Sequence, residues 1–232
     1  MTRTTPVVPP TKVDPKLSLV ITALVVVYIV WGSTYLGIRI VVEEAPPLIS
    51  MGLRFTTAAL VLGSILVLRR GPRGRLGRLA ITPRELLGAA FLGLMLPMLG
   101  NGLVSVGENM GAPSGVTALL IAVAPLWIIV FRAVEGDRPP PLTMFGVLLG
   151  FVGLAFLILA GRGGDALELA PALVILLAST CWAIGSYAQP RLRLPKDVFV
   201  MAVYEMLTGV LIMISVGLIS GERFTGDYSA RT

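Results

Sequence analysis

The chain has 232 residues, of which 55% are hydrophobic and 14% are charged, with a mean hydropathy of +0.87 and a net charge of +6. Because soluble domains carry about 25% charged residues, a chain of this length could not bury so much apolar surface in water. One cysteine and no histidine exclude an intrachain disulfide, a cysteine metal cluster and histidine-based catalysis. The composition therefore predicts a protein whose solvent is the lipid bilayer.

Seven apolar spans follow one another along the chain, each bounded by charged residues, proline or glycine. A helix that crosses the bilayer needs about 20 apolar residues, so we predict an all-α membrane protein. The first span is too long for the hydrophobic region of a signal peptide, which has about 7–15 residues, and is expected to stay in the protein. The predicted transmembrane helices are residues 17–42, 48–68, 86–106, 113–131, 142–160, 169–189 and 198–219.

Two polar segments flank these spans. Residues 1–16 are rich in proline and threonine and carry three basic side chains, so they are expected to form a disordered cytoplasmic tail. Residues 221–232 form a second polar tail, expected on the outside.

The placement of the basic residues predicts the orientation of the chain. If the N-terminus is cytoplasmic, the inside segments hold most of the lysines and arginines, including six arginines between Arg69 and Arg84. Because lysine and arginine concentrate on the cytoplasmic side of membrane proteins, we predict a multi-pass protein with a cytoplasmic N-terminus. The orientation of the chain in the membrane therefore explains its positive net charge, and no nucleic-acid partner is expected. The outside segments hold only Arg39, Arg162, Arg223 and Arg231.

A weak internal repeat relates the first two spans to the last two. At an offset of 151 residues, Trp31 corresponds to Trp182 and Arg54 corresponds to Glu205. The repeat starts at the first span and again at the sixth, so one unit contains five spans and the second copy enters the membrane inverted. Inverted repeats are a recurring architecture of secondary transporters. We therefore predict a ten-helix inverted 5+5 repeat, truncated after its seventh helix, with a first unit at 17–160 and the start of a second at 169–220.

Two charged residues inside spans are candidate site residues. Arg54 lies about six residues into the second span, where a charge is costly unless it pairs or faces water. It either serves a central cavity or extends its side chain to the outer interface. Glu205, its repeat counterpart, is a candidate for binding a substrate or a coupling ion, and a direct pair with Arg54 is a further alternative.

The first and sixth spans contribute four more candidates. Trp31 and Ser33 stand beside a glycine in the first span, and Trp182 and Ser186 occupy similar surroundings in the sixth. Small residues allow helix backbones to approach closely, while hydroxyl groups can contact a substrate. These residues therefore serve either helix packing or the substrate cavity.

The third and fourth spans are interrupted by proline. Asn101 follows Pro97 among several glycines, so this stretch is either a structural kink or a broken helix that lines a cavity. Glu108 is expected in an outer loop, exposed to water. Pro125 is expected to kink the fourth span beside Trp127, which lies either at the inner interface or at the cavity.

The sequence contains no arrangement of residues that is typical of an enzyme active site. A glycine-rich phosphate loop of the GxxxxGK[ST] type is not found, and no nucleophile–base pair or metal cluster is visible. We therefore expect a protein that is not an enzyme and needs no cofactor. If it transports a solute, the energy is expected to come from a proton or ion gradient, or from the gradient of the substrate itself.

Several segments together resemble EamA-type members of the drug/metabolite transporter superfamily, over about residues 17–221. These are IVWGSTYLGIRIVVEEAPPLISMGLRF, GNGLVSVGE, PSGVTALLIAVAPLW, WAIGSYAQPRLRLP and YEMLTG. The resemblance implies ten helices in two inverted units around a central cavity. It also implies export of amino acids, metabolites or drug-like molecules across the bacterial inner membrane.

If the family's cavity carries over, the resemblance implies a lining that includes Trp31, Asn101, Trp127, Trp182 and Glu205. The expected partners are the lipid bilayer and a small-molecule substrate, and no oligomeric state is predicted. The alternative hypothesis is a truncated membrane fragment or scaffold without transport activity, because the helices that would match the eighth to the tenth are not in the sequence.

Overall fold

The computed structural model describes residues 17–68, 79–160 and 168–223. Within these ranges every regular element is a helix, as the sequence predicted. The chain divides into two compact units, Met1–Thr34 and Tyr35–Thr232, and each is described by itself. The predicted tail at residues 1–16 and most of the tail at residues 221–232 lie outside the described residues.

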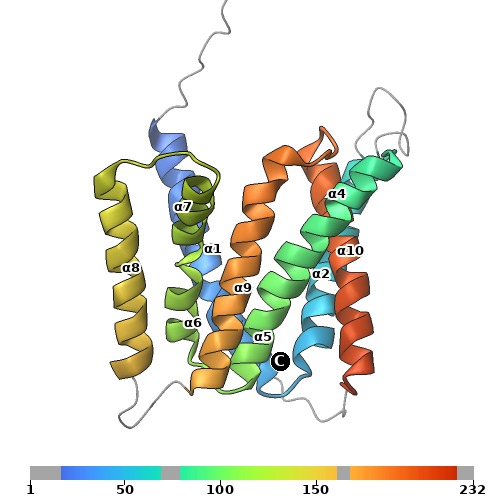
Figure 1. The fold of residues 1–232 in the computed structure, drawn as a ribbon. Helices are drawn as coiled ribbons and strands as arrows, with labels where there is room; N and C mark the ends of the chain where they lie inside the picture. Colours follow the sequence, from blue (N-terminus) through green and yellow to red (C-terminus); the bar gives the residue numbers. More distant parts are fainter. Residues whose placement is uncertain (1–16, 69–78, 161–167, 224–232) are drawn as a thin grey trace, which may run out of the picture. The chain divides into compact units, whose positions relative to one another are not determined.

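All seven predicted spans are helical (Figure 1). Six stretches are long and apolar enough to cross a membrane: Leu17–Val42, Pro47–Leu68, Pro83–Asn109, Ser114–Val134, Leu169–Arg191 and Val198–Ile219. The fifth predicted span forms an apolar helix whose described side chains end at Phe156. The described elements are α1 (Leu17–Val42), α2 (Pro47–Leu68), α4 (Pro83–Gly93), the π-helix η1 (Leu94–Gly102), α5 (Leu103–Asn109), α6 (Ser114–Ile121), α7 (Ala124–Val134), α8 (Pro141–Ala160), α9 (Leu169–Ala188), the 3-10 turn η2 (Gln189–Arg191) and α10 (Val198–Ile219).

The first unit contributes the N-terminal part of α1. Two of its threonine hydroxyl groups bond within the helix, because Thr22 Oγ1 donates to the Ser18 carbonyl at 2.8 Å and Thr34 Oγ1 donates to the Val30 carbonyl at 3.0 Å. Such bonds to the preceding turn give these two hydroxyl protons a partner in an apolar environment. A helix of this composition therefore suits a membrane span.

The third span is longer than predicted and changes its winding. It was expected at residues 86–106, but it runs from Pro83 to Asn109 through α4, η1 and α5. The start is fixed by a capping box, in which the Glu85 backbone N–H donates to Thr82 Oγ1 and the Thr82 N–H donates to Glu85 Oε2. Pro97 lies inside the π-helical stretch, so the predicted interruption takes the form of a widened helix.

The fourth span was predicted to be kinked by Pro125, and it is interrupted directly before this proline. Helix α6 ends at Ile121, and α7 starts at Ala124, with Pro125 in its first turn. Proline is tolerated in a first turn because its missing N–H would have no partner there. The two halves of the span can therefore differ in direction.

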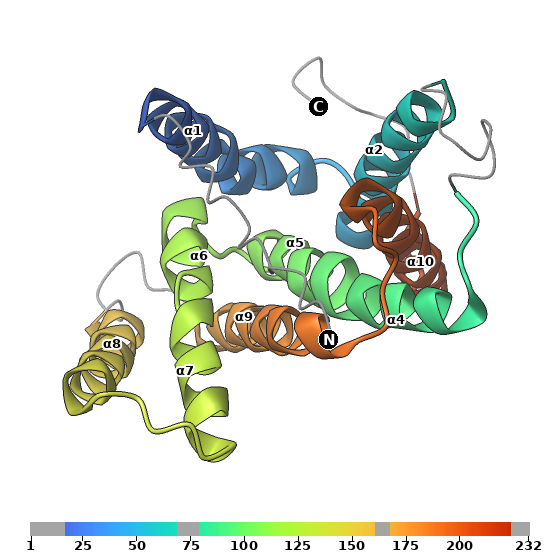
Figure 2. The same ribbon diagram turned by 90° about the horizontal axis from the view of Figure 1, so that it is seen from above.

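In the second unit, the core lies around the third span. Viewed from above, α9 and α10 border different faces of this span, and α2 lies beyond α10 (Figure 2). The residues Leu92, Leu120, Ile175 and Met213, from four different spans, are completely buried. The third span therefore contacts α2, α6, α9 and α10, whereas α7 packs on α9 and α8 packs on α7.

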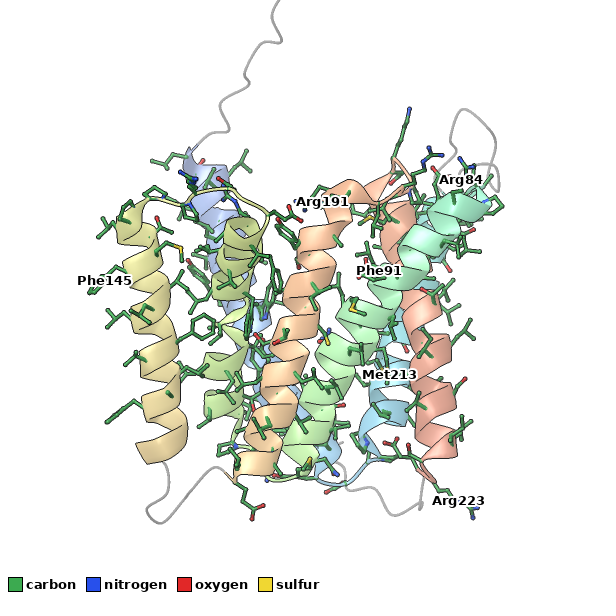
Figure 3. The ribbon with its side chains drawn as sticks, in the orientation of Figure 1. Arg84, Phe91, Phe145, Arg191, Met213 and Arg223 are labelled. Carbon is green, nitrogen blue, oxygen red and sulfur yellow. The ribbon has the colours of Figure 1, made fainter. Side chains whose placement is uncertain are left out.

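The arginines separate between the two ends of the helices. Arg84 and Arg191, both predicted on the inside, lie at one end, and Arg223, predicted on the outside, lies at the other (Figure 3). The described arrangement is therefore compatible with the charge pattern, and the identity of the cytoplasmic end remains a prediction.

Candidate functional site

The π-helical stretch η1 is approached by α9 through positions that lack side chains. A Cβ atom on Gly100 would lie 3.1 Å from Cε3 of Trp182, and one on Gly185 would lie 2.9 Å from Cβ of Met95. Gly100 allows the Trp182 ring to lie directly on the backbone of the third span, and Gly185 allows the Met95 and Leu96 side chains to lie on the backbone of α9. Because π-helical turns occur frequently at functional sites, this contact is a natural centre for a candidate site.

Helix α10 reaches the same span through closer backbone contacts. The Cα of Gly93 faces the Glu205 carbonyl and the Thr208 hydroxyl, with no room for a side chain. A Cβ on Gly209 would lie 2.7 Å from the Gly93 carbonyl oxygen and 2.8 Å from Cβ of Pro97. The widened helix is therefore held between Trp182 of α9 and the segment of α10 that contains Glu205.

Four of the predicted site residues lie on the elements of this arrangement. Asn101 Nδ2 donates to the Leu96 carbonyl at 3.2 Å, within the π-helical stretch. Trp182 lies against Gly100, and Ser186 follows one turn later on α9, half-buried. Glu205 is half-buried on α10, and its carboxylate has no hydrogen bond or ion pair among the described residues.

Arg54 and Trp127 do not join this group. The exposed Arg54 has its Nη1 atom 3.5 Å from Sδ of Met51 and its guanidinium 5.5 Å from the ring centre of Phe55, both on its own helix. No Arg54–Glu205 ion pair forms within the described part of the chain, so that alternative is wrong. Trp127 instead packs with its ring centre 6.3 Å from Phe131 and 5.1 Å from Phe151.

Trp31 and Ser33 belong to the first unit and are described there alone. Ser33 Oγ donates to the Val30 carbonyl at 3.1 Å, so its hydroxyl is used within α1. Their membership of a substrate cavity stays a prediction.

The expectation of an exposed Glu108 is wrong. Glu108 lies in α5 and is completely buried, and neither carboxylate oxygen has a hydrogen-bond partner among the described residues. Its carbonyl accepts a hydrogen bond of 2.6 Å from Arg39 Nη1, whose Nε also pairs with Glu43 at 3.1 Å. The helix ends at Asn109, and Gly111 follows with φ at +105°. A glycine at this position is a sequence signal for the end of a helix, but Gly107 gives the same signal earlier, so the sequence could not place the end.

One end of α7 and α9 carries an exposed polar network. Tyr187 Oη donates to Glu135 Oε2 at 2.6 Å, and Arg191 Nη2 donates to the same oxygen at 2.7 Å. The Arg191 guanidinium also lies 4.0 Å from the centre of the Tyr187 ring. A cavity of about 380 Å³ adjoins this network, with apolar side chains of α7 and α9 on its walls. The network therefore joins the fourth span to the sixth.

At the opposite end, Glu222 joins α10 to α2. Its carboxylate accepts hydrogen bonds from the backbone N–H groups of Leu48, at 3.1 Å, and Ile49, at 2.9 Å. These are orphan donors of the first turn of α2, so a residue from the far end of the chain caps this helix. Gly221 has φ at +82°, which turns the chain back toward α2 after α10 ends.

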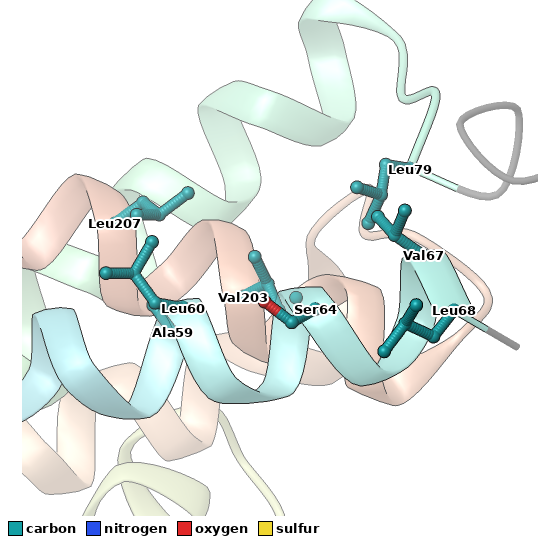
Figure 4. Close-up of a pocket in the computed structure, with 9 residues that line it drawn as sticks. Ala59, Leu60, Ser64, Val67, Leu68, Leu79, Val203 and Leu207 are labelled. Atoms are coloured by element: carbon teal, nitrogen blue, oxygen red, sulfur yellow. The ribbon is translucent and has the colours of Figure 1, made fainter.

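The groove between α2 and α10 is larger and almost entirely apolar (Figure 4). It has a volume of about 520 Å³, and Ser64 supplies the hydroxyl group among the side chains of its lining. A surface of this kind suits hydrocarbon and offers little for binding a polar solute. In the described ranges, no three His, Cys, Asp or Glu side chains gather to form a metal site.

These features define a multi-pass helical membrane protein with a widened third span. The sequence pattern of the EamA-like transporter family matches residues 18–159, and the chain belongs to this family. The homologous proteins support a location in the bacterial inner membrane.

The relatives include the uncharacterized inner membrane transporter YedA of Escherichia coli strain K12, which is 38% identical over 205 residues. That alignment covers 88% of this chain and 63% of YedA, so the chain spans less than two thirds of this relative. The uncharacterized transporter YvbV of Bacillus subtilis strain 168 is 28% identical, over 90% of this chain and 65% of its own. A probable terminal-alkyne amino-acid exporter of Streptantibioticus cattleyicolor is 28% identical, over 86% of this chain and 64% of its own. No solved structure matches the chain.

Proposed function

We propose that the protein is a secondary transporter that exports amino acids, metabolites or drug-like small molecules from the bacterial cell by alternating access. The observation that carries this proposal is membership of the EamA-like transporter family, together with 38% identity to a protein named as an inner membrane transporter. The probable amino-acid exporter among the relatives supports an amino acid as the first substrate to test. The N-terminus is proposed to be cytoplasmic.

The arrangement around the third span supports a substrate site there. Trp182 places its aromatic ring on Gly100, the residue before Asn101, and Glu205 offers an unpaired carboxylate on the other flanking helix. An amphipathic solute with an ammonium group could use the ring for its apolar part and the carboxylate for its charge. Ser186 remains a proposed member of this site, and Trp31 and Ser33 remain proposed cavity residues of the complete transporter.

The inverted 5+5 repeat is also proposed for the complete transporter. The repeat counterparts α2 and α10 pack against each other, as the helices of two units related by a pseudo-twofold axis would. The relatives are longer than this chain, and we propose that a complete second unit includes helices matching the last three of the first.

Counterflow in proteoliposomes tests the transport proposal. Vesicles loaded with an unlabelled amino acid should take up the same labelled amino acid when they contain the purified protein, and empty vesicles should not. Replacing Trp182 by Ala should reduce uptake strongly, while Leu211→Ala, on the exposed surface of α10, should leave it unchanged. Absence of counterflow for amino acids, metabolites and cationic drugs would favour the alternative of a transport-inactive membrane fragment or scaffold.

A further inference from the structure

Glu108 is a buried carboxylate that the proposed substrate contacts leave unused. It is 0% exposed, and both of its carboxylate oxygens lack hydrogen-bond partners in the described part of the chain. An ionised carboxylate in apolar surroundings is costly unless it is paired and hydrogen-bonded, and such groups become neutral instead. Within membrane proteins, ionisable residues in these positions mark ion pathways and proton relays.

The helices packed against α5 provide no fixed counter-ion. The elements η1, α6 and α9 contain no Asp, Glu, Lys or Arg. The titratable Cys181 and Tyr187 lie further along α9, because Gly107 of α5 packs on Ile175 near the start of that helix. Helix α2 carries only Arg54, which is exposed and contacts its own helix.

The charged groups near this end of the molecule are engaged elsewhere or exposed. Glu43 pairs with Arg39, and Glu222 caps α2. Glu168, which precedes α9, is exposed, and Glu44, which follows α1, is exposed as well. The carboxylate of Glu108 is therefore without a neutralising ion pair among the described residues.

Arg39 is the cation whose charge acts on this carboxylate. It lies within electrostatic reach, yet its Nη1 atom donates to the backbone carbonyl of Glu108 and its Nε atom to Glu43. The hydroxyl of Thr117, also beside the carboxylate, donates to the Pro113 carbonyl at 3.1 Å. This arrangement fits a protonated Glu108, and it holds Arg39 ready to pair with the carboxylate after the proton leaves.

We propose that Glu108 binds and releases the proton that couples transport to the proton gradient, an inference that rests on the proposed transport function. The reaction is the combination of one carboxylate with one proton to give one carboxylic acid. Glu108 follows Asn101 by seven residues, or about two helical turns, so both lie on the same face of the third span. Loss of the proton would draw Arg39 away from Glu43 and shift the end of α1 against α5.

Infrared difference spectroscopy of the purified protein tests the proton site without a substrate. At neutral pH, we expect a C=O band of a protonated carboxylic acid that shifts on exchange into D2O. Glu108→Gln should remove the Glu108 component of this band, in the unmodified protein and equally in a Glu205→Gln background, while Glu43→Gln should leave the band unchanged. Circular dichroism and size-exclusion chromatography establish that each variant is folded. A band that is the same in Glu205→Gln and in the double variant Glu108→Gln, Glu205→Gln would overturn the proposal.

Two further measurements separate the alternatives. If the carboxylic acid band is present in choline buffer and disappears when sodium is added, Glu108 binds a metal cation and the proton proposal is wrong. In proteoliposomes, Glu108→Gln should retain counterflow, because glutamine mimics the protonated side chain, and should lose uptake driven by a pH gradient. Unchanged gradient-driven uptake in this variant would also overturn the proposal. Absence of counterflow in the unmodified protein would instead argue against the transport function, and the infrared result would stand by itself.

Discussion

Helices α9 and α10 both pack on the third span, but they do so in different ways. At α10 the contact is between backbones: Gly209 lies against the carbonyl of Gly93 and the ring of Pro97. At α9 side chains cover glycines, since Trp182 lies on Gly100 and the Met95 and Leu96 side chains lie on Gly185. A backbone contact cannot adjust without moving a helix, whereas a side chain can change its rotamer.

The two helices also differ in how they end. After α10, the half-buried Glu222 bonds two backbone N–H groups of α2. After α9, Arg191 bonds Glu135 in a pair whose side chains are 51% and 53% exposed. We infer that α10, α2 and the third span move as one body, and that α9 is joined to its neighbours less rigidly. The predictions below follow from this difference.

The largest loss of stability is expected from a side chain at the α10 contact. Gly209→Ala places a Cβ where a carbonyl oxygen and a proline ring lie within 2.7–2.8 Å, and neither can move independently of its helix. We expect a loss of about 2–3 kcal/mol in the free energy of unfolding, measured by denaturation in mixed detergent micelles. Gly146→Ala on α8 is the matched control, because nothing lies within 4 Å of its added Cβ. Equal losses of unfolding free energy for both substitutions would show that the close backbone contact of Gly209 does not determine the stability.

Removing the carboxylate of Glu222 should have the next largest effect. Glu222→Ala leaves two backbone donors of α2 without their partner, and we expect a loss of about 1–2 kcal/mol. Glu168→Ala is a close control, because Glu168 also stands at a helix N-terminus but makes no capping hydrogen bond. The same unfolding measurement should show almost no change for Glu168→Ala. A loss as large as that of Glu222→Ala would show that helix-dipole charge, rather than the specific cap, matters.

The sequence predicted the helices well but not their mutual contacts. Long apolar runs identify spans because the membrane requires them, and Pro97 and Pro125 marked the two interruptions. Glu108 escaped prediction because Arg39, 69 positions away, and the distant helices α2 and α9 pack around α5. The Arg54–Glu205 alternative failed because a matching position in a repeat does not determine which way a side chain points. The cap of α2 by Glu222 likewise joins residues 174 positions apart.

A smaller effect is expected where α9 meets the third span. Gly100→Ala brings a Cβ to 3.1 Å from the Trp182 ring, which must shift by a few tenths of an ångström. We expect a loss of about 1 kcal/mol, less than for Gly209→Ala, because a side chain is the group that moves. The movement should appear as a change in tryptophan near-ultraviolet circular dichroism. If the spectrum is unchanged and stability falls as far as in Gly209→Ala, the α9 contact is as rigid as that of α10.

The smallest effect is expected from the ion pair that joins α7 and α9. Both side chains are half exposed, and exposed pairs contribute roughly 0–1 kcal/mol because water and salt screen them. A double-mutant cycle of Glu135→Gln and Arg191→Gln should therefore give a coupling energy in this range, and the coupling should fall further at high salt. Tyr187→Phe removes the second donor to Glu135 and tests whether the hydroxyl strengthens the pair. A coupling energy above about 2 kcal/mol would mean that α9 is fastened as firmly as α10, and the inferred difference in mobility would then be wrong.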